Sequence, residues 1–384
     1  MIIMRNFFKR AAAGAVALAM CAGLAGCYSE DKTWAAKLGE DTLPIGGYIY
    51  YLSSAYSQGA SEVGTDTDVL NATIEDQNAQ DWIKDAAMDS LYSYYFVSQK
   101  FNELGLSLDE EDQTAIENAT SSMWGYFRTP LEPLGVAQSS FRQAYSVYNM
   151  KLKKLMLTMY GKSGEMELSE DELREYYAGN YTYYQYFLVN HSTTDDDGNS
   201  TPMEDDEKAE IKERLDDYVE LINNGRQTLD EAAANYANAS STEPNLSEPV
   251  SVRTSSMSAL FADALKELDN DKATLVDASS YYYVVQKLDV SDGFEALLED
   301  QDRMDNLILE MKQEEFLDYT MEQGANVGVE VNQKAIASVK LSKVADAMGK
   351  KGVSSEASSS EASETSSEES SEESSGEESA SSEE

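Results

Sequence analysis

Cys27 is the residue whose surroundings in this 384-residue chain point most directly to chemistry. It follows Leu-Ala-Gly at residues 24–26, which come after basic residues at positions 5, 9 and 10 and an apolar run over residues 11–24. A basic start, an apolar stretch too short for a typical membrane span and small residues before a cysteine are typical of a lipoprotein signal peptide. We therefore expect residues 1–26 to be removed and Cys27 to be lipidated. The alternative is an ordinary secretory signal in which Cys27 has no role.

Other residues that commonly bind metals or act as nucleophiles are scarce. Cys21 lies in the segment that we expect to be removed, and His191 is the single histidine. With no second histidine or free cysteine, a metal or nucleophile set cannot be completed around His191. Residues 193–204 have part of the spacing of a calcium loop, but Thr193 stands where the first aspartate would be, which favours a solvated turn. We expect neither a bound metal nor a cofactor.

The charge of the chain excludes some partners and favours others. The formal net charge is −42, and residues 354–384 are almost only Ser, Glu and Ala. Such a stretch cannot bury enough apolar surface to offset the entropy of ordering, so we expect it to be disordered, and we place the start of the disordered tail at residue 341. Because no basic patch is visible, we expect no nucleic-acid partner. A cationic or unfolded polypeptide would be attracted, although plain solubility explains the charge equally well.

Apolar periodicity predicts an amino-terminal part made mainly of helices. Residues 35–51 predict a short strand, a turn and a first helix, and helical spacing continues over residues 81–105 and 139–160. Ser107 with Glu110, and Ser169 with Glu172, have the spacing of capping boxes at helix starts.

The middle of the chain has a different pattern. Residues 183–189 and 281–288 are aromatic and β-branched runs that predict buried strands. Between them, apolar spacing predicts helices over residues 211–225, 229–236 and 257–268. The pattern therefore predicts a small α+β unit, followed by a helix over residues 294–311 and a short strand over residues 327–332.

This order of elements resembles the foldase lipoproteins of Gram-positive bacteria, relatives of the periplasmic chaperone SurA. In that family a parvulin-type peptidyl-prolyl isomerase domain interrupts a helical chaperone domain. The similar stretches cover most of the chain from residue 34 to residue 331: FNELGLSLDEED (101–112), ELSEDELREYYAGN (167–180), YQYFLV (184–189), ANYANASS (234–241) and the run from residue 257 to residue 288.

The resemblance implies a binding pocket but not its catalytic residues. The two histidine positions of the family hold Tyr186 and Tyr283 here, and its acidic or cysteine position holds Ala239. Met257 and Phe261 match the residues that line the family's proline pocket, so the resemblance implies them as substrate-binding residues. The tyrosine hydroxyls could replace part of the lost polar network, but we favour core aromatics of a degenerate domain. Met257 and Phe261 could equally be core residues.

The sequence thus predicts an α+β protein with a helical SurA-like chaperone domain, an inserted parvulin-like domain and a disordered acidic tail. The expected bounds are a signal peptide at 1–26, helical parts at 27–180 and 291–340, the parvulin-like domain at 181–290 and the tail at 341–384. The expected function is that of a membrane-anchored, extracytoplasmic chaperone for unfolded or partly folded secreted proteins, with weak or no isomerase activity. An active prolyl isomerase and a cell-surface binding or adhesion lipoprotein are the alternatives, and a homodimer is left open.

Overall fold

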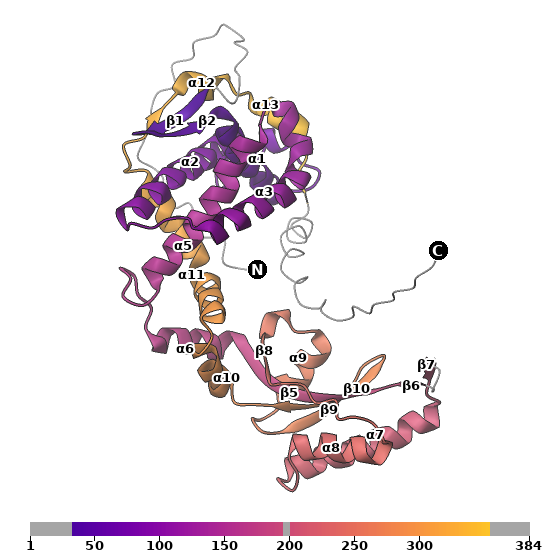
Figure 1. Cartoon of the computed structure of the whole chain (residues 1–384). Helices are drawn as coiled ribbons and strands as arrows, with labels where there is room; N and C mark the ends of the chain where they lie inside the picture. The colour runs from indigo at the N-terminus through magenta and orange to yellow at the C-terminus, as the bar shows by residue number, and fades with distance from the viewer. Residues whose placement is uncertain (1–32, 195–199, 354–384) are drawn as a thin grey trace, which may run out of the picture. The chain divides into compact units, whose positions relative to one another are not determined.

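The computed structural model describes residues 33–194 and 200–353, which form two compact units (Figure 1). Unit 1 contains the described residues of 33–156 and 314–353, and unit 2 contains Leu157–Gln313. The predicted signal peptide, Cys27 and residues 354–384 of the predicted tail lie outside the described residues. The chain is therefore an α+β protein in which unit 2 is inserted into the sequence of unit 1.

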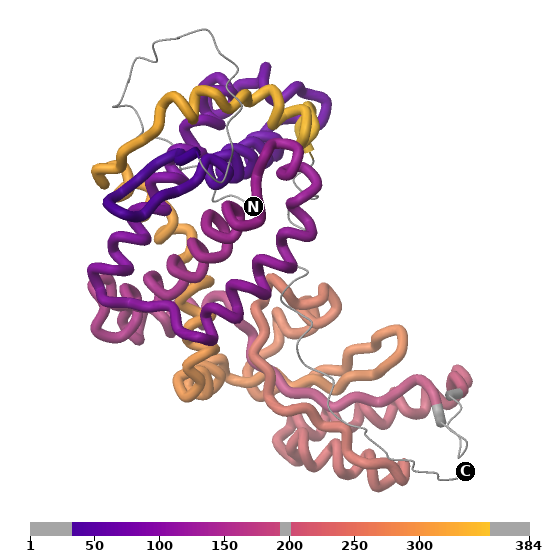
Figure 2. The backbone as a smooth tube through the Cα atoms, turned by 45° about the horizontal axis from the view of Figure 1, so that its top comes forward, coloured from indigo at the N-terminus to yellow at the C-terminus, as the bar shows by residue number. Residues whose placement is uncertain are grey.

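Unit 1 begins with a hairpin that is completed by the far end of the chain. Strands β1 (Trp34–Leu38) and β2 (Asp41–Pro44) turn at Gly39, whose φ of 61° lies in the left-handed region that glycine adopts without strain. β11 (Glu330–Val331) pairs with β1 on its other side, giving the antiparallel order β11-β1-β2. Figure 2 shows the yellow carboxyl-terminal trace beside this indigo hairpin.

Helices make up most of the rest of unit 1. Helix α2 packs on a small β3–β4 hairpin, and one helical segment is π-helical. The bounds are α1 (Ile45–Glu62), β3 (Thr73–Ile74), β4 (Gln77–Asn78), α2 (Ala79–Glu103), α3 (Glu110–Leu131), α4 (Gln138–Phe141), the π-helix (Arg142–Val147), α5 (Tyr148–Tyr160), α11 (Gln301–Gly324), α12 (Gln333–Ser338) and α13 (Leu341–Met348).

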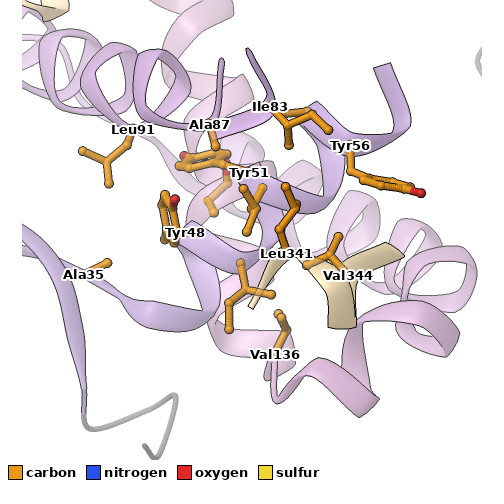
Figure 3. Packing of buried hydrophobic residues seen from close by; sticks show 14 of the residues in the cluster. Ala35, Tyr48, Tyr51, Tyr56, Ile83, Ala87, Leu91, Val136, Leu341 and Val344 are labelled. Atoms are coloured by element: carbon orange, nitrogen blue, oxygen red, sulfur yellow. The ribbon is translucent and has the colours of Figure 1, made fainter. Parts of the chain in front are cut away.

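The core of unit 1 joins segments from both ends of the chain. Tyr48 and Tyr51 of α1 pack with Ile83 and Leu91 of α2, and Leu341 of α13 lies in the same cluster (Figure 3). Apolar side chains of this size each contribute about 1.5–3 kcal/mol when fully buried. The core therefore combines side chains from near both ends of the described chain.

Helix α11 packs closely on α2. The hydroxyls of Ser93 and Thr320 lie 2.7 Å apart, and the Ser93 hydroxyl is also 2.7 Å from that of Tyr148. A Cβ on Gly324 would lie 2.6 Å from the backbone of Tyr92, so glycine is required where the two helices approach. Buried hydroxyls are mostly hydrogen-bonded, and these three satisfy one another between α2, α5 and the part of α11 that lies in unit 1.

The predicted tail begins later than residue 341. Leu341, Val344 and Ala345 recur at helical spacing in α13 and are buried in the core of unit 1. The prediction of disorder was wrong for residues 341–353, because the Ser/Glu-rich composition starts only after them and their apolar burial offsets the entropy of ordering.

Unit 2 is built on an antiparallel sheet with the order β8-β5-β10-β9. Its elements, in chain order, are α6 (Glu170–Asn180), β5 (Tyr181–Asn190), β6 (Ser192–Thr194), β7 (Ser200–Pro202), α7 (Asp205–Asn223), α8 (Leu229–Ser240), β8 (Val250–Arg253), α9 (Ala259–Lys266), β9 (Ala273–Asp277), β10 (Tyr281–Lys287) and α10 (Val290–Leu298).

The two faces of this sheet are covered unequally. Phe187 and Val189 of β5 are 2% and 5% exposed, because α7 and α8 pack over their face. The other face is covered by α9, which has eight residues (Figure 1). Val276 and Val285 on that second face are buried, but Tyr184 and Tyr186 are only partly buried.

Helices α6 and α10 belong to unit 2, although the sequence analysis assigned them to the helical domain. The Glu310 carboxylate of α11 accepts hydrogen bonds from the hydroxyls of Tyr176, at 2.9 Å, and Tyr181, at 2.5 Å, and lies 3.1 Å from Arg253 Nε. The ring of Tyr177 lies 5.6 Å from that of Phe294. The unit boundaries therefore fall inside α5 and α11 rather than at residues 180 and 290.

Several predicted elements are confirmed and others change. The strands over residues 183–189 and 281–288 are β5 and β10, and Ser169 with Glu172 forms the predicted capping box. The Ser107 capping box was wrong, since Asp109 caps α3 together with Asp112. The helix predicted over residues 294–311 breaks because the Asp300 carboxylate accepts a hydrogen bond from the Arg303 backbone amide and starts α11 anew. Strands β8 and β9 were not predicted.

Tyr95 tests how the β1–β2 hairpin is attached to α2. Its buried hydroxyl donates to the Ala36 carbonyl at 2.5 Å and accepts from the Leu43 amide at 3.0 Å, where the β1–β2 register is irregular. Burial raises the pKa of Tyr95 above its ordinary value, so the hydroxyl stays protonated and can donate. Tyr95→Phe leaves both backbone groups without a partner, so we expect a loss of about 1–3 kcal/mol in the free energy of unfolding of unit 1.

The free energy of unfolding of Tyr95→Phe is measured by urea denaturation, and hydrogen exchange of the unit 1 amides shows whether the loss lies in that unit. Tyr126→Phe is the matched control, because Tyr126 is 71% exposed and loses only a solvated hydroxyl. Equal unfolding free energies for Tyr95→Phe and the control would contradict the proposed attachment.

Candidate functional site

The strand register places a group of tyrosines on the open face of the unit 2 sheet. Tyr186 of β5 is opposite Val285 of β10, and Tyr184 is opposite Lys287. Directly opposed residues of an antiparallel pair lie on the same face, and so do residues two apart in one strand. Tyr283 is two residues before Val285, so it shares a face with Tyr184 and Tyr186. This is the face under α9, where Tyr283 is also only partly buried.

Helix α9 brings Phe261 to the same face, and Met257, two residues before the helix begins, packs in the same cluster. Leu265, one turn after Phe261, is buried against Val276 and Val285 of the sheet. The Lys287 ammonium group donates to the carbonyls of Leu265, at 3.1 Å, and Leu268, at 2.8 Å, which are carbonyls at the end of α9. A cation at a helix carboxyl end is stabilising, so α9 is held over the sheet at both its apolar side and its end.

The side chains on this face line an open hollow of about 330 Å³, which we call the aromatic pocket. This volume is at the lower end of the range for ligand pockets. The pocket is lined by Tyr184, Tyr186, Val252, Ser256, Met257, Ser258, Phe261 and Tyr283. The structure therefore brings together Tyr186, Tyr283, Met257 and Phe261, the residues that the sequence analysis selected.

Three ring pairs of the aromatic pocket meet at steep angles, whereas Tyr184 stacks on Tyr186 at 29° and is tilted by 45° against Phe261. Phe261 and Tyr283 have ring centroids 5.1 Å apart and planes at 75°, and Tyr186 and Tyr283 are 5.5 Å apart at 67°. Tyr186 and Phe261 are 6.3 Å apart at 74°. Such edge-to-face pairs are favourable, so the rings hold their arrangement while remaining partly exposed.

The polar groups of the pocket are neutral. The hydroxyls of Tyr184, Tyr186 and Tyr283 make no hydrogen bond with any residue that the structure describes. Burial raises the pKa of Tyr283 and of Tyr184 above the ordinary value for tyrosine, and the neighbouring Tyr186 raises both further. The lining contains no carboxylate, histidine or cysteine, so it offers no group that exchanges a proton near neutral pH.

Two other residues of the sequence analysis lie outside the pocket. Ala239 is exposed near the end of α8 and does not line the hollow. His191 follows β5, with its ring 4.3 Å from that of Tyr282 and its Nε2 3.9 Å from Asp277 Oδ1. Because Tyr282 faces the α7 and α8 side, His191 takes no part in the pocket.

Sequence reasoning missed Tyr184, Val252, Ser256 and Ser258 as lining residues. Tyr184 is two residues before Tyr186 in a strand, so the strand period of two could have identified it. Val252 could not be found in this way, because strand β8 was not predicted.

A slightly larger hollow, of about 380 Å³, is found in unit 1. It is lined by Leu38, Asp41, Ser98, Gln99, Asn102 and Glu103. Ser98, Gln99, Asn102 and Glu103 lie on α2, and no aromatic ring lines this hollow. The aromatic pocket is the better candidate site, because aromatic rings and Met257 converge there from several segments of unit 2.

Within residues 33–194 and 200–353, no cluster of three His, Cys, Asp or Glu side chains is placed to bind a metal ion. Every helix in that part of the chain is too short or too polar to span a membrane.

Comparison with known proteins gives matches among solved structures alone. No protein-family model and no curated protein matches the sequence. The foldase protein PrsA from Lactococcus lactis is similar, with 14% identity, a TM-score of 0.35, and coverage of 82% of this chain and 99% of that one. PrsA from Streptococcus pneumoniae has 14% identity, a TM-score of 0.34, and coverage of 80% and 100%. PrsA from Bacillus subtilis has 13% identity, a TM-score of 0.30, and coverage of 70% and 94%.

Proposed function

We propose that this protein is a tethered chaperone whose aromatic pocket binds apolar segments of unfolded polypeptides outside the cytoplasm. The observation that carries this proposal is the pocket itself, in which four aromatic rings and the Met257 thioether remain partly exposed on a folded sheet. Aromatic and methionine side chains adapt to varied apolar partners without demanding one geometry. A site of this kind suits clients of varied sequence.

The shape of the pocket fits a short apolar group, such as a proline ring, better than a whole folded surface. The hollow is small, and its hydroxyl groups can donate to or accept from a peptide backbone. A bound segment would therefore bury one or two apolar side chains and leave the rest of the client free. Binding at such a site is expected to be weak and reversible, as a holding function requires.

Catalysis of prolyl isomerisation is expected to be weak. Rotation about an X-Pro bond has a barrier of about 18–20 kcal/mol, and an enzyme lowers it by binding the twisted amide more tightly than the planar one. In the described chain, Tyr186 and Tyr283 occupy the positions where the resembled family has histidines, and Ala239 lies outside the pocket. The pocket therefore supports binding more than acceleration.

An active isomerase is the second candidate function, and one observation favours it. The hydroxyls of Tyr186 and Tyr283 have no partner in the described chain and line the hollow, so they are free to hydrogen-bond a twisted amide.

The location of the protein is proposed from the sequence. Residues 1–26 have the composition of a lipoprotein signal, and Cys27 would carry the lipid. A lipid on Cys27 would hold the chaperone at the outer face of the membrane, where secreted chains emerge unfolded. The strongly acidic composition would keep the tethered protein soluble among them.

Phe261→Ala is the direct test of the binding site. The substitution removes a ring that contacts Tyr184, Tyr186 and Tyr283, so we expect the dissociation constant of a proline-containing apolar peptide to rise by at least about tenfold. Fluorescence anisotropy of the labelled peptide measures it. Tyr126→Ala, which removes an exposed ring in unit 1, should leave the affinity unchanged.

The affinity measurement is paired with thermal unfolding of each variant. If Phe261→Ala lowers the melting temperature of unit 2 but leaves peptide affinity at the wild-type value, Phe261 is a core residue and the pocket is not the binding site.

Isomerase activity on short proline peptides is expected to be absent or marginal. Uncatalysed isomerisation takes about tens to hundreds of seconds, so even weak acceleration is detectable in a protease-coupled assay. Activity within about tenfold of an ordinary parvulin, equivalent to a loss of only about 1.4 kcal/mol in transition-state stabilisation, would contradict the binding-only proposal. In that case Tyr186→Phe and Tyr283→Phe should abolish the activity, since they remove only the hydroxyls.

Cys27→Ser tests the membrane anchor. Because the lipid requires the Cys27 thiol, the variant should move from the membrane fraction to the medium or remain unprocessed. Cell fractionation with an antibody to the protein measures this, and Ser29→Ala serves as a neighbouring control. A Cys27→Ser protein that is processed and still membrane-bound would disprove the lipoprotein assignment.

A further inference from the structure

We propose that the aromatic pocket recognises an arginine side chain in the bound segment, an inference that rests on the proposed function and makes it more specific. The pocket would hold the planar guanidinium group against its rings, while the apolar stem of the arginine and its neighbours bury the remaining surface. Clients would then be selected for basic residues within apolar stretches.

The arrangement of the rings supports a cationic ligand. Tyr186, Phe261 and Tyr283 form three pairs whose planes meet at 67–75° and whose centroids lie 5.1–6.3 Å apart. Rings set at such angles direct their π faces in different directions. A cation within about 6 Å of a ring centroid is attracted to the face of the ring, and aromatic cages that bind ammonium groups use several faces at once.

The hydroxyl groups add acceptors to these faces. Tyr184, Tyr186 and Tyr283 each place an unpartnered hydroxyl in the lining, as judged within the described residues. A guanidinium group has five N–H donors and no acceptor, so it matches oxygen atoms that are free to accept. It is also weakly hydrated and stacks on aromatic rings, which makes its transfer from water into the pocket less costly than that of an ammonium group.

The protein's own cations near the pocket are engaged elsewhere. Lys287 shares the face of Tyr283, but its ammonium group donates to carbonyls at the end of α9. Arg253 follows Val252 in β8, but its Nε lies 3.1 Å from the Glu310 carboxylate. The lining itself contains no Lys, Arg or His. The faces of the pocket are therefore not already paired with a positive charge.

The net negative charge of the protein also favours basic clients. With a net charge of −42, the protein attracts basic segments and repels acidic ones before any contact forms. That attraction is screened by salt beyond about 8–10 Å, whereas contact with the rings is screened much less. A preference that depends on the rings can therefore be separated from one that depends only on overall charge.

The test uses two blocked peptides of the same apolar, proline-containing sequence, one with arginine beside the proline and the other with citrulline, its neutral isostere. Their dissociation constants are measured at physiological salt with the full mature chain and with Tyr283→Leu and Tyr283→Phe. All three proteins carry the same net charge, so remote attraction is held constant. Circular dichroism and thermal unfolding confirm that each variant is folded.

We expect the wild type to bind the arginine peptide about tenfold more tightly than the citrulline peptide. Tyr283→Phe, which keeps the ring, should retain most of this ratio, and Tyr283→Leu, which keeps only apolar bulk, should lose most of it. Equal affinities of the wild type for both peptides would overturn the inference while leaving the proposed function intact.

A ratio that is unchanged in Tyr283→Leu would also overturn the inference, because the preference would then come from overall charge. If the wild type binds neither peptide, the proposed function fails and the inference fails with it.

Discussion

The structure depends on the return of the chain to the β1–β2 hairpin. Ala36 pairs with Leu43 on one side and with Val331 on the other, so a residue near the start of the described chain is held by one near its end. Asn332 strengthens this closure, because its side-chain amide donates to the Trp34 carbonyl at 2.9 Å and its backbone amide to the Ala35 carbonyl at 2.8 Å. Closing so long a loop has an entropic cost, which burial of the core offsets. Unit 2 is thus an insertion in the sequence, and its bounds fall within helices α5 and α11.

The candidate site follows from the unequal covering of one sheet. Side chains alternate between the two faces along β5. Phe187 and Val189 therefore lie under α7 and α8, and Tyr184 and Tyr186 lie under the short α9. A helix of that length cannot cover four strands, so large rings stay partly exposed where β5 and β10 meet α9. Ring-to-ring contacts and the neutral hydroxyls keep these groups ordered without filling the hollow. One face holds the larger buried cluster, and the other holds a smaller one, of Leu265, Val276 and Val285, beside the aromatic pocket.

Much of this architecture could be predicted from the sequence, and the failures have physical causes. The strands β5 and β10 were found because their aromatic and β-branched runs are long, and Met257 and Phe261 were found through a resemblance to a known family. Strand β8 was missed because Val250 and Val252 alternate with Ser251 and Arg253 over only four residues, and its pairing with β5 is a tertiary event. Helix α13 was missed because residues 341–384 were assigned as one acidic tail. The helix is held by only three buried side chains, those of Leu341, Val344 and Ala345, and composition alone does not reveal them.

The central claim is that the aromatic pocket holds unfolded clients, and aggregation of an unrelated unfolded protein tests it most directly. The client is diluted from denaturant into the mature chain, and its light scattering is followed over time. The account predicts that the wild type suppresses scattering and that the double variant Tyr186→Ala, Phe261→Ala, still folded by circular dichroism, suppresses it much less. Equal suppression by both proteins, or none by the wild type, would contradict the account.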